Sequence, residues 1–384
     1  MSVVAAPATK GRLHAMVIGV SRYSHRSNLT TPGPAMSAAL FAQWLRNEFR
    51  HPELALGTMR VLLSPTDQEA EPAAQAAGRI DGEPTRDTVD AELNAWGNRC
   101  NRSAADAALL YLAGHGTSMV AAGGLLLLQD FGAPGAALGR ALHIDAVRDA
   151  METRVAHANF FFVDACQQTM PEQANITNPQ AVTGVDLVPG KRRRKFYRAI
   201  YGAAPDEKAW TLAPKEAVKH GTVFSKALLQ ALKTVADFDD NGRFSVTVNR
   251  LIAETALNVE RGGDELRKQF GRGIQGTSQA SGTGGDRTFH VPEHVPVELS
   301  IHLDPETAAN SATAKLYRYS RPRHAVLHGL VTLTPQPATL VVDVGKYKLQ
   351  LTAPPPPAEI DQIDEYVVLP ETAHWMVPIE YITR

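Results

Sequence analysis

The sequence has 384 residues, a length that suggests two domains or one large domain with an appendage, and its 44% hydrophobic and 21% charged residues are typical of a globular protein. Its formal net charge of −1 excludes a global field that would draw the chain to nucleic acid or to an anionic membrane. Two cysteines, Cys100 and Cys166, cannot build a disulfide framework and favour a reducing compartment. No run approaches the ~20 apolar residues of a membrane span, and the N-terminus lacks a signal-peptide pattern. We therefore expect a cytoplasmic protein that binds neither nucleic acid nor membrane.

Strand and helix patterns alternate over the first two thirds of the chain. Continuous apolar runs predict buried strands at 14–20, 59–65, 107–116, 123–130, 158–166 and 198–204. Helical spacing of apolar residues predicts helices at 35–49, 85–100, 144–156 and 223–236. The alternation predicts an α/β domain with a mostly parallel sheet flanked by helices, whose reactive groups gather at the carboxyl ends of the strands.

Two polar segments interrupt this pattern, and after them the sequence contains only short strand patterns. Residues 171–195 are punctuated by Pro and Gly and end in five consecutive cations, which predicts a loop. Residues 271–288 are rich in Gly, Ser and Thr, which predicts a loop that is flexible or closes over something. From residue 292 onward, short alternating runs separated by Pro and Gly predict an all-β, sandwich-like domain. We expect two domains, residues 1–291 and 292–384.

One histidine and one cysteine lie just past the ends of predicted strands. "AGHG" places His115 between two glycines, and "DAC" ends the next strand on Cys166, 51 residues later. A thiol becomes a nucleophile when a base promotes its thiolate, and the acyl intermediate needs amide donors for its oxyanion. A lone cysteine is usually a small buried hydrophobe, but glycine flanks, strand-end placement and this spacing favour a reactive pair. Cys100 shows none of these features and is expected to be structural.

"LLYLAGHG" followed by "FFFVDAC" resembles the paired signature of the caspase-like cysteine peptidases, which include caspases, metacaspases and bacterial relatives. "HAMVIGVSRY", "RAIYGAAPDEKAW", "HGTVFSKALLQAL" and "DFDDNGRFSVTVNRLIAE" resemble further segments of that family in the same order, over about residues 10–290. The resemblance implies a cysteine endopeptidase with a Cys–His dyad and a thioester intermediate. It implies that His115 is the general acid–base, Cys166 the nucleophile, and the amides of Gly116 and Cys166 the oxyanion hole. It also implies that Ala203 and Ala204 line the substrate cleft.

Asp164 carries the expectation about specificity. In metacaspases an aspartate two residues before the nucleophile lines the S1 pocket and pairs with Arg or Lys of the substrate, and Asp164 matches that position. Metacaspases usually carry a second pocket aspartate, where this chain has Pro34. Arg22 and Arg26 precede that position and could bind an acidic P1 side chain instead. Cleavage after Arg or Lys is therefore the first hypothesis, with an acidic P1 as the alternative.

Further expectations accompany this interpretation. The five cations are Lys191, Arg192, Arg193, Arg194 and Lys195, and they are candidates for self-cleavage of a zymogen or, equally, for a solvated or anion-binding face. "DFDDNG" begins like an EF-hand loop, but Val248 stands where a bidentate Glu is needed, so we reject an EF-hand. We expect no metal site and no cofactor. Calcium activation stays open, because metacaspases often use other acidic sites. The C-terminal β-domain is expected to bind a regulator or partner, and a non-catalytic caspase-fold scaffold is a second alternative; relatives often act in bacterial defence.

Overall fold

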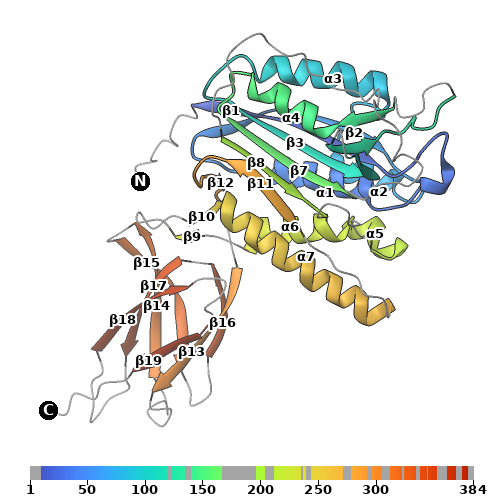
Figure 1. Ribbon diagram of the computed structural model, residues 1–384. Coiled ribbons are helices and arrows are strands. Elements are labelled where there is room, and N and C mark those ends of the chain that lie inside the picture. Colours follow the sequence, from blue (N-terminus) through green and yellow to red (C-terminus); the bar gives the residue numbers. More distant parts are fainter. Residues whose placement is uncertain are drawn as a thin grey trace. The chain divides into compact units, whose positions relative to one another are not determined.

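The computed structural model divides into two compact units, residues 1–232 with 251–287 and residues 233–250 with 288–384 (Figure 1). The structure describes residues 10–119, 123–134, 140–166, 196–203, 212–234, 237–238, 244–270, 278–292, 296–304, 312–321, 324–333, 338–343, 345–352, 361–368 and 374–378.

A six-stranded sheet forms the centre of the first unit, in the order β11-β8-β7-β3-β1-β2 (Figure 1). Its strands are β1 (Gly11–Val20), β2 (Leu54–Ser64), β3 (Ala107–Gly114), β7 (Ala158–Ala165), β8 (Phe196–Tyr201) and β11 (Gln279–Thr283). The first five are parallel to one another, and β11 runs antiparallel to β8. The predicted parallel α/β sheet is thus confirmed.

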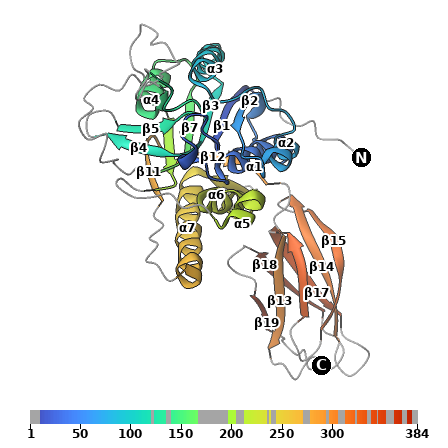
Figure 2. The same ribbon diagram turned by 90° about the vertical axis from the view of Figure 1, so that its right-hand side faces the viewer.

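Helices cover both faces of this sheet (Figures 1 and 2). One face packs against α3 (Arg86–Arg99) and α4 (Ile144–Glu152), where Trp96 and Met151 share a core with Phe161 of β7. On the other face, Phe41 of α1 (Pro34–Asn47) stacks on Tyr111 with centroids 4.5 Å apart. Burying each such aromatic side chain contributes about 1.5–3 kcal/mol. Because successive residues of a strand face opposite sides, each central strand serves both cores.

The remaining helices complete the first unit and lead into the second. They are η1 (Ser27–Leu29), α2 (Ala70–Ala77), α5 (Pro214–His220), α6 (Val223–Thr234) and α7 (Val248–Phe270). A small antiparallel sheet of β4 (Gly116–Met119), β5 (Gly123–Leu127) and β6 (Ala141–His143) follows β3 (Figure 2). The strand predicted at 123–130 therefore exists, but it lies in this side sheet.

The glycine-rich segment 271–288 was predicted to be a loop, and this is wrong for β11. A β-carbon at Gly282 would lie 2.1 Å from the carbonyl oxygen of Tyr197 on β8. Glycine therefore marks the close approach of two strands at this position. Residues 271–277 of the segment lie outside the described residues.

The second unit consists of strands in small sheets, as predicted for the C-terminal region. One sheet contains β9 (Asp237–Phe238), β10 (Phe244–Thr247) and β12 (Thr288–His290). The two other sheets have the strand orders β16-β13-β19 and β15-β14-β17-β18. Their strands are β13 (Pro296–Asp304), β14 (Ala312–Arg321), β15 (His324–Leu333), β16 (Ala338–Asp343), β17 (Gly345–Thr352), β18 (Asp361–Val368) and β19 (His374–Pro378). Leu299, Ile301, Leu316, Tyr347 and Leu349 are buried in it.

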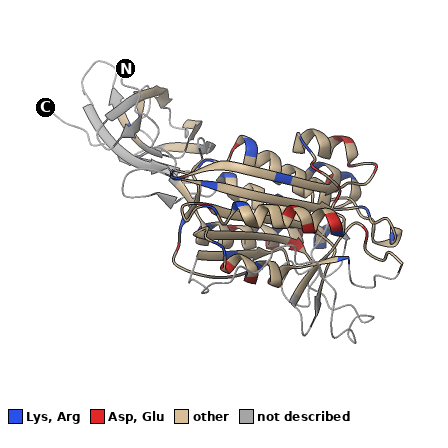
Figure 3. Cartoon of the chain, turned by 90° about the horizontal axis from the view of Figure 1, so that it is seen from above, with Lys and Arg blue, Asp and Glu red and all other residues tan. Residues whose placement is uncertain are grey.

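Charges of both signs are interspersed over the described part of the first unit (Figure 3). This agrees with the net charge of −1. No helix in the described ranges is both long and apolar enough to cross a membrane.

Candidate active site

His115 and Cys166 lie at the same edge of the central sheet. His115 follows β3 and Cys166 follows β7, and these strands are parallel neighbours. Their register pairs Gly114 with Ala165, so His115 and Cys166 are the next residue along each strand. A β-carbon at Gly116 would lie 2.3 Å from the carbonyl oxygen of Cys166. Only glycine allows the two segments to approach this closely.

The imidazole of His115 is held by a backbone carbonyl. Its Nε2 lies 2.7 Å from the carbonyl oxygen of Leu29, in the loop between β1 and α1. Because a carbonyl only accepts hydrogen bonds, Nε2 carries the proton and the lone pair of the neutral ring is on Nδ1. Burial lowers the pKa of His115, and the hydrogen bond to Leu29 opposes part of that effect. The ring is therefore neutral at physiological pH and can take up a proton at Nδ1.

The backbone of His115 is held from the same loop. Its N–H donates to the hydroxyl oxygen of Tyr23 over 3.0 Å, and the two rings lie 5.6 Å apart at 47°. Tyr23 is buried, and burial raises the pKa of its hydroxyl, which stays protonated. The loop between β1 and α1 thus contacts both the amide and the ring of His115.

The carboxyl of Asp164 lies in a buried cluster of hydroxyl groups. Oδ2 accepts hydrogen bonds from the hydroxyls of Thr222 and, over 3.3 Å, of Tyr111. Oδ1 has no hydrogen-bond partner among the described residues, although Asp164 is only 2% exposed. A β-carbon at Gly202 would lie 3.4 Å from Oδ1, so this oxygen faces the backbone just after β8. Burial raises the pKa of Asp164 to about 7, because the surrounding hydroxyls offset only part of its desolvation.

Thr222 connects this cluster to two helices. Its hydroxyl oxygen accepts from the N–H of Ser225, as an N-cap of α6 does, over 3.1 Å. Its own N–H donates to the hydroxyl of Ser37 on α1 over 2.9 Å. The Asp164 side chain is therefore enclosed by β3, β7, α1 and the start of α6.

The position of the missing second acid is occupied by the start of α1. Pro34 is the first residue of that helix. The carboxylate at the N-terminus of the helix belongs to Glu69, which lies in the chain between β2 and α2. Glu69 accepts from the N–H groups of Gly33 over 2.7 Å and Met36 over 3.3 Å, and it is fully buried. An anion at a helix N-terminus is stabilised by the unpaired amides and the helix dipole.

The two arginines considered for an acidic P1 residue have other contacts. Nη2 of Arg22 lies 3.0 Å from a carboxylate oxygen of Glu83, so its guanidinium is already paired. A β-carbon at Gly132 would lie 2.7 Å from Nε of Arg26, so Arg26 packs on the turn at that glycine.

Of the other predicted site residues, the structure describes Ala203 and Cys100. Ala203 is buried directly after β8. Ala204 and residues 171–195, with the cations Lys191, Arg192, Arg193, Arg194 and Lys195, lie outside the described residues. Cys100 is fully buried, as expected for a structural cysteine.

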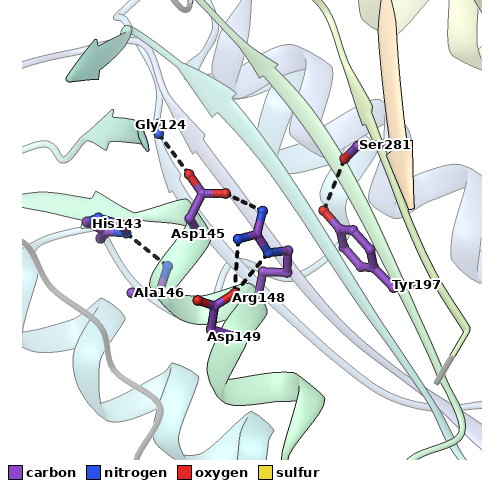
Figure 4. A network of polar contacts seen from close by, with 8 residues as sticks. All are labelled: Gly124, His143, Asp145, Ala146, Arg148, Asp149, Tyr197 and Ser281. Atoms are coloured by element: carbon purple, nitrogen blue, oxygen red, sulfur yellow. Dashed lines mark hydrogen bonds and ion pairs between the residues drawn. The ribbon is translucent and has the colours of Figure 1, made fainter. Parts of the chain in front are cut away.

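A charged network on α4 bears on the question of calcium (Figure 4). The guanidinium of Arg148 lies 2.5 Å from Asp145 and 3.0 Å from Asp149, and Asp145 also accepts from the N–H of Gly124. Arg148 therefore already supplies the cation for these two carboxylates. Among the residues that the structure describes, no group of three or more His, Cys, Asp or Glu side chains could hold a metal ion.

Comparison with known families gives one match that decides the affiliation. The family of the caspase domain, peptidase C14, matches residues 12–279. This chain belongs to the caspase-domain family. The caspase-domain chain also matches the solved structure titled "structure of pro-sf-caspase-1", at 12% identity and a TM-score of 0.39, over 74% of this chain and 93% of that one. A comparison with curated proteins found no match. As a caspase-domain protein, the chain is a cysteine-type endopeptidase whose substrates are proteins.

Several residues around the site escaped the sequence analysis of this caspase-domain chain. Leu29 acts through a backbone carbonyl, which leaves no side-chain signal. Tyr23 lies three residues beyond β1. A tyrosine so close to a buried strand could have indicated a hydroxyl with a buried hydrogen-bond partner. Thr222 directly precedes an apolar helical run, which is the pattern of an N-cap.

Proposed function

We propose that Cys166 is the nucleophile of this endopeptidase and that His115 is its general acid–base. The observation that carries the proposal is the parallel register of β3 and β7, which sets the two residues next to each other at the carboxyl edge of the sheet. The neutral ring with its lone pair on Nδ1 adds support, because that form of His115 can accept the thiol proton.

The reaction would then proceed through a thioester. His115 takes the proton of Cys166, and the sulfur attacks the scissile carbonyl carbon. The negative oxygen of the tetrahedral intermediate accepts from the amides of Gly116 and Cys166. The C–N bond breaks, the leaving amine takes the proton from His115, and the thioester remains. Water, deprotonated by His115, then attacks the thioester carbonyl carbon. The C–S bond breaks, the acid is released, and the sulfur of Cys166 takes the proton back from His115.

We further propose that the enzyme cleaves after Arg or Lys and that Asp164 recognises that side chain. The support is the unpartnered, buried Oδ1, because a guanidinium or ammonium group would satisfy it with a charge-assisted hydrogen bond. The contacts of Arg22 and Arg26 with Glu83 and Gly132 weigh against the acidic P1 alternative.

Fluorogenic peptides that end in Arg, Lys or Asp test these proposals, with and without calcium. We expect wild type to hydrolyse the Arg and Lys peptides, and Cys166→Ala and His115→Ala to lose at least about a thousandfold in kcat. Asp164→Asn should lose activity toward Arg and Lys peptides while its Cys166 still reacts with iodoacetamide. Hydrolysis of the Asp peptide alone would support the acidic P1 alternative, and no hydrolysis by wild type would support the scaffold.

The same samples test self-processing. If the enzyme cleaves after basic residues, the run at 191–195 offers five candidate sites, so wild type should be cut there on incubation and Cys166→Ala should stay intact. Mass spectrometry of the fragments locates the cut. An intact wild-type chain with a reactive Cys166 would contradict self-processing. We also propose that the C-terminal strands bind a regulator or partner, which pull-down with residues 292–384 deleted would test.

A further inference from the structure

The amide of His115 lies where regular strand pairing stops. β3 ends at Gly114 and β4 begins at Gly116, so His115 falls between two strands. The carbonyl oxygen of His115 accepts a hydrogen bond from the N–H of Leu127, a backbone group. The N–H of His115 does not donate to a backbone carbonyl, and its partner is a side chain, the hydroxyl of Tyr23. A buried N–H without an acceptor is costly, so this contact fixes the backbone on which the imidazole is carried.

Tyr23 is itself held independently of His115. Its N–H donates to the hydroxyl of Thr30 over 3.2 Å, and the next residue, Ser24, donates to the carbonyl of Gln129 over 2.9 Å. Its side chain is only 2% exposed. Because the surroundings fix Tyr23 on both sides of the chain, it can impose a position on His115.

The hydroxyl of Tyr23 has a second capacity that the contact with His115 does not use. A phenol oxygen accepts with its lone pairs and donates with its proton, and here the amide of His115 occupies only an acceptor site. Besides burial and the His115 amide, the group that acts on the pKa of Tyr23 is Cys166, whose negative charge raises it. The phenol stays protonated, so its unused O–H is a hydrogen-bond donor, and donation toward the sulfur would favour the thiolate of Cys166.

We propose that Tyr23 is a positioning residue of the peptidase reaction, whose hydroxyl and ring hold His115 in the orientation that serves Cys166. This inference rests on the proposed roles of His115 and Cys166. Tyr23 and Leu29 then act together, one on the amide and one on Nε2, so the loop between β1 and α1 sets the geometry of the dyad.

A purely structural role of Tyr23 predicts something different. It would lower the melting temperature and the amount of folded enzyme, but each folded molecule would keep its kcat and the reactivity of its thiol. A positioning role changes kcat and the pH dependence of thiol alkylation at unchanged KM, because substrate binding does not involve the hydroxyl.

The test uses the full chain with Tyr23→Phe, which keeps the ring and removes only the oxygen. The second variant is Thr30→Val, which loosens the backbone of Tyr23 at an exposed position. The matched control is Tyr197→Phe, a buried tyrosine of β8 whose hydroxyl lies 3.5 Å from Ser281 (Figure 4). For each protein we would measure kcat and KM on the Arg peptide, the rate of iodoacetamide alkylation of Cys166 from pH 5 to pH 9, and the melting temperature.

We expect Tyr23→Phe to lower kcat about tenfold with KM within about twofold, and to move the alkylation midpoint to higher pH by about half a unit or more. Thr30→Val should change both quantities in the same direction by a smaller amount, and Tyr197→Phe should leave both unchanged. Should Tyr23→Phe fail to fold, Thr30→Val decides. Wild-type kcat and an unshifted alkylation midpoint in the folded variants would overturn the inference. Peptidase activity in Cys166→Ala would instead overturn the proposed function.

Discussion

Two opposing effects set the pKa of the Asp164 carboxyl. Its burial favours the protonated carboxyl, and the hydroxyls of Thr222 and Tyr111 favour the carboxylate. Burial prevails, so the pKa lies at about 7 and the group carries roughly half a charge at neutral pH. A bound cation would shift this balance toward the carboxylate. Recognition of Arg or Lys by Asp164 would therefore release protons near neutral pH.

The raised pKa of Asp164 makes a prediction about stability. An unfolded chain holds this carboxyl at its ordinary pKa near 3.9, so between about pH 4 and pH 7 the folded protein binds the extra proton. The stability that this proton contributes is present at low pH and is lost as the pH rises through 7, on the order of 1.4 kcal/mol per unit of pKa shift. Asp164→Asn carries no such charge, so its melting temperature should rise relative to wild type between pH 5 and pH 8.5. Scanning calorimetry at both values checks this.

Asp90→Asn provides the control for that series, because Asp90 is exposed on α3. Its melting-temperature difference from wild type is the baseline at each pH. A difference for Asp164→Asn that is the same at pH 5 and pH 8.5 would contradict the assignment of a near-neutral pKa to this carboxyl.

At the scale of elements, the loop between β1 and α1 depends on one buried carboxylate. Glu69 accepts from the hydroxyl of Ser21 at the start of the loop, from Gly33 and Met36 at its end, and from the N–H and hydroxyl of Thr66. The two ends of the loop and the segment after β2 therefore converge on a single side chain. Tyr23 and Leu29, which hold His115, lie between these ends.

Replacing Glu69 with Gln should weaken both stability and catalysis. The amide nitrogen of Gln cannot accept, so at least one N–H group among those of Gly33, Met36 and Thr66 loses its acceptor, at a cost of about 1–3 kcal/mol. We expect the melting temperature to fall by several degrees and kcat on the Arg peptide to fall with it, as the loop that positions His115 loosens. Glu71→Gln, on the exposed first turn of α2, should change neither. A stable Glu69→Gln enzyme with wild-type kcat would show that the loop does not need this anchor.

The sequence predicted the central elements because their signals are local. Apolar runs located the parallel strands, and strand-end placement with glycine flanks singled out His115 and Cys166 before any contact was known. The helix α2 was missed, since its core-facing residues Ala73, Ala76 and Ala77 give little hydrophobic contrast. β11 was missed because its glycine and small polar residues read as a loop, whereas the edge of β8 supplies the reason for a strand there.

The surroundings of Asp164 could not be predicted in this way. Its partners come from β3, α1 and the residue before α6, and only the fold brings these segments together. Aspartate at this position was recognisable from the motif, but its burial and raised pKa are properties of the assembled cluster.

At the scale of the whole molecule, the boundary between the two units does not fall at one point in the sequence. Residues 233–250 group with the C-terminal strands although α7 continues from them into the first unit. The link is β12, which pairs antiparallel with β10, and β10 leads directly into α7. A deletion of the C-terminal strands can therefore either keep or remove the partner of β10.

Two truncations that differ only in β12 test which boundary supports the peptidase. A chain ending after Pro292 keeps β12, including the buried side chain of Phe289, and we expect it to hydrolyse the Arg peptide with kcat/KM within about threefold of the full chain. A chain ending after Asp286 exposes the edge of β10 and loses the burial of Phe289, which costs about 3 kcal/mol and lowers the melting temperature by about 6–12 °C. Peptide hydrolysis and thermal melting of the two truncations decide the matter. Equal melting temperatures would mean that β12 belongs with the C-terminal strands alone, and loss of activity in both would mean that the peptidase needs the second unit.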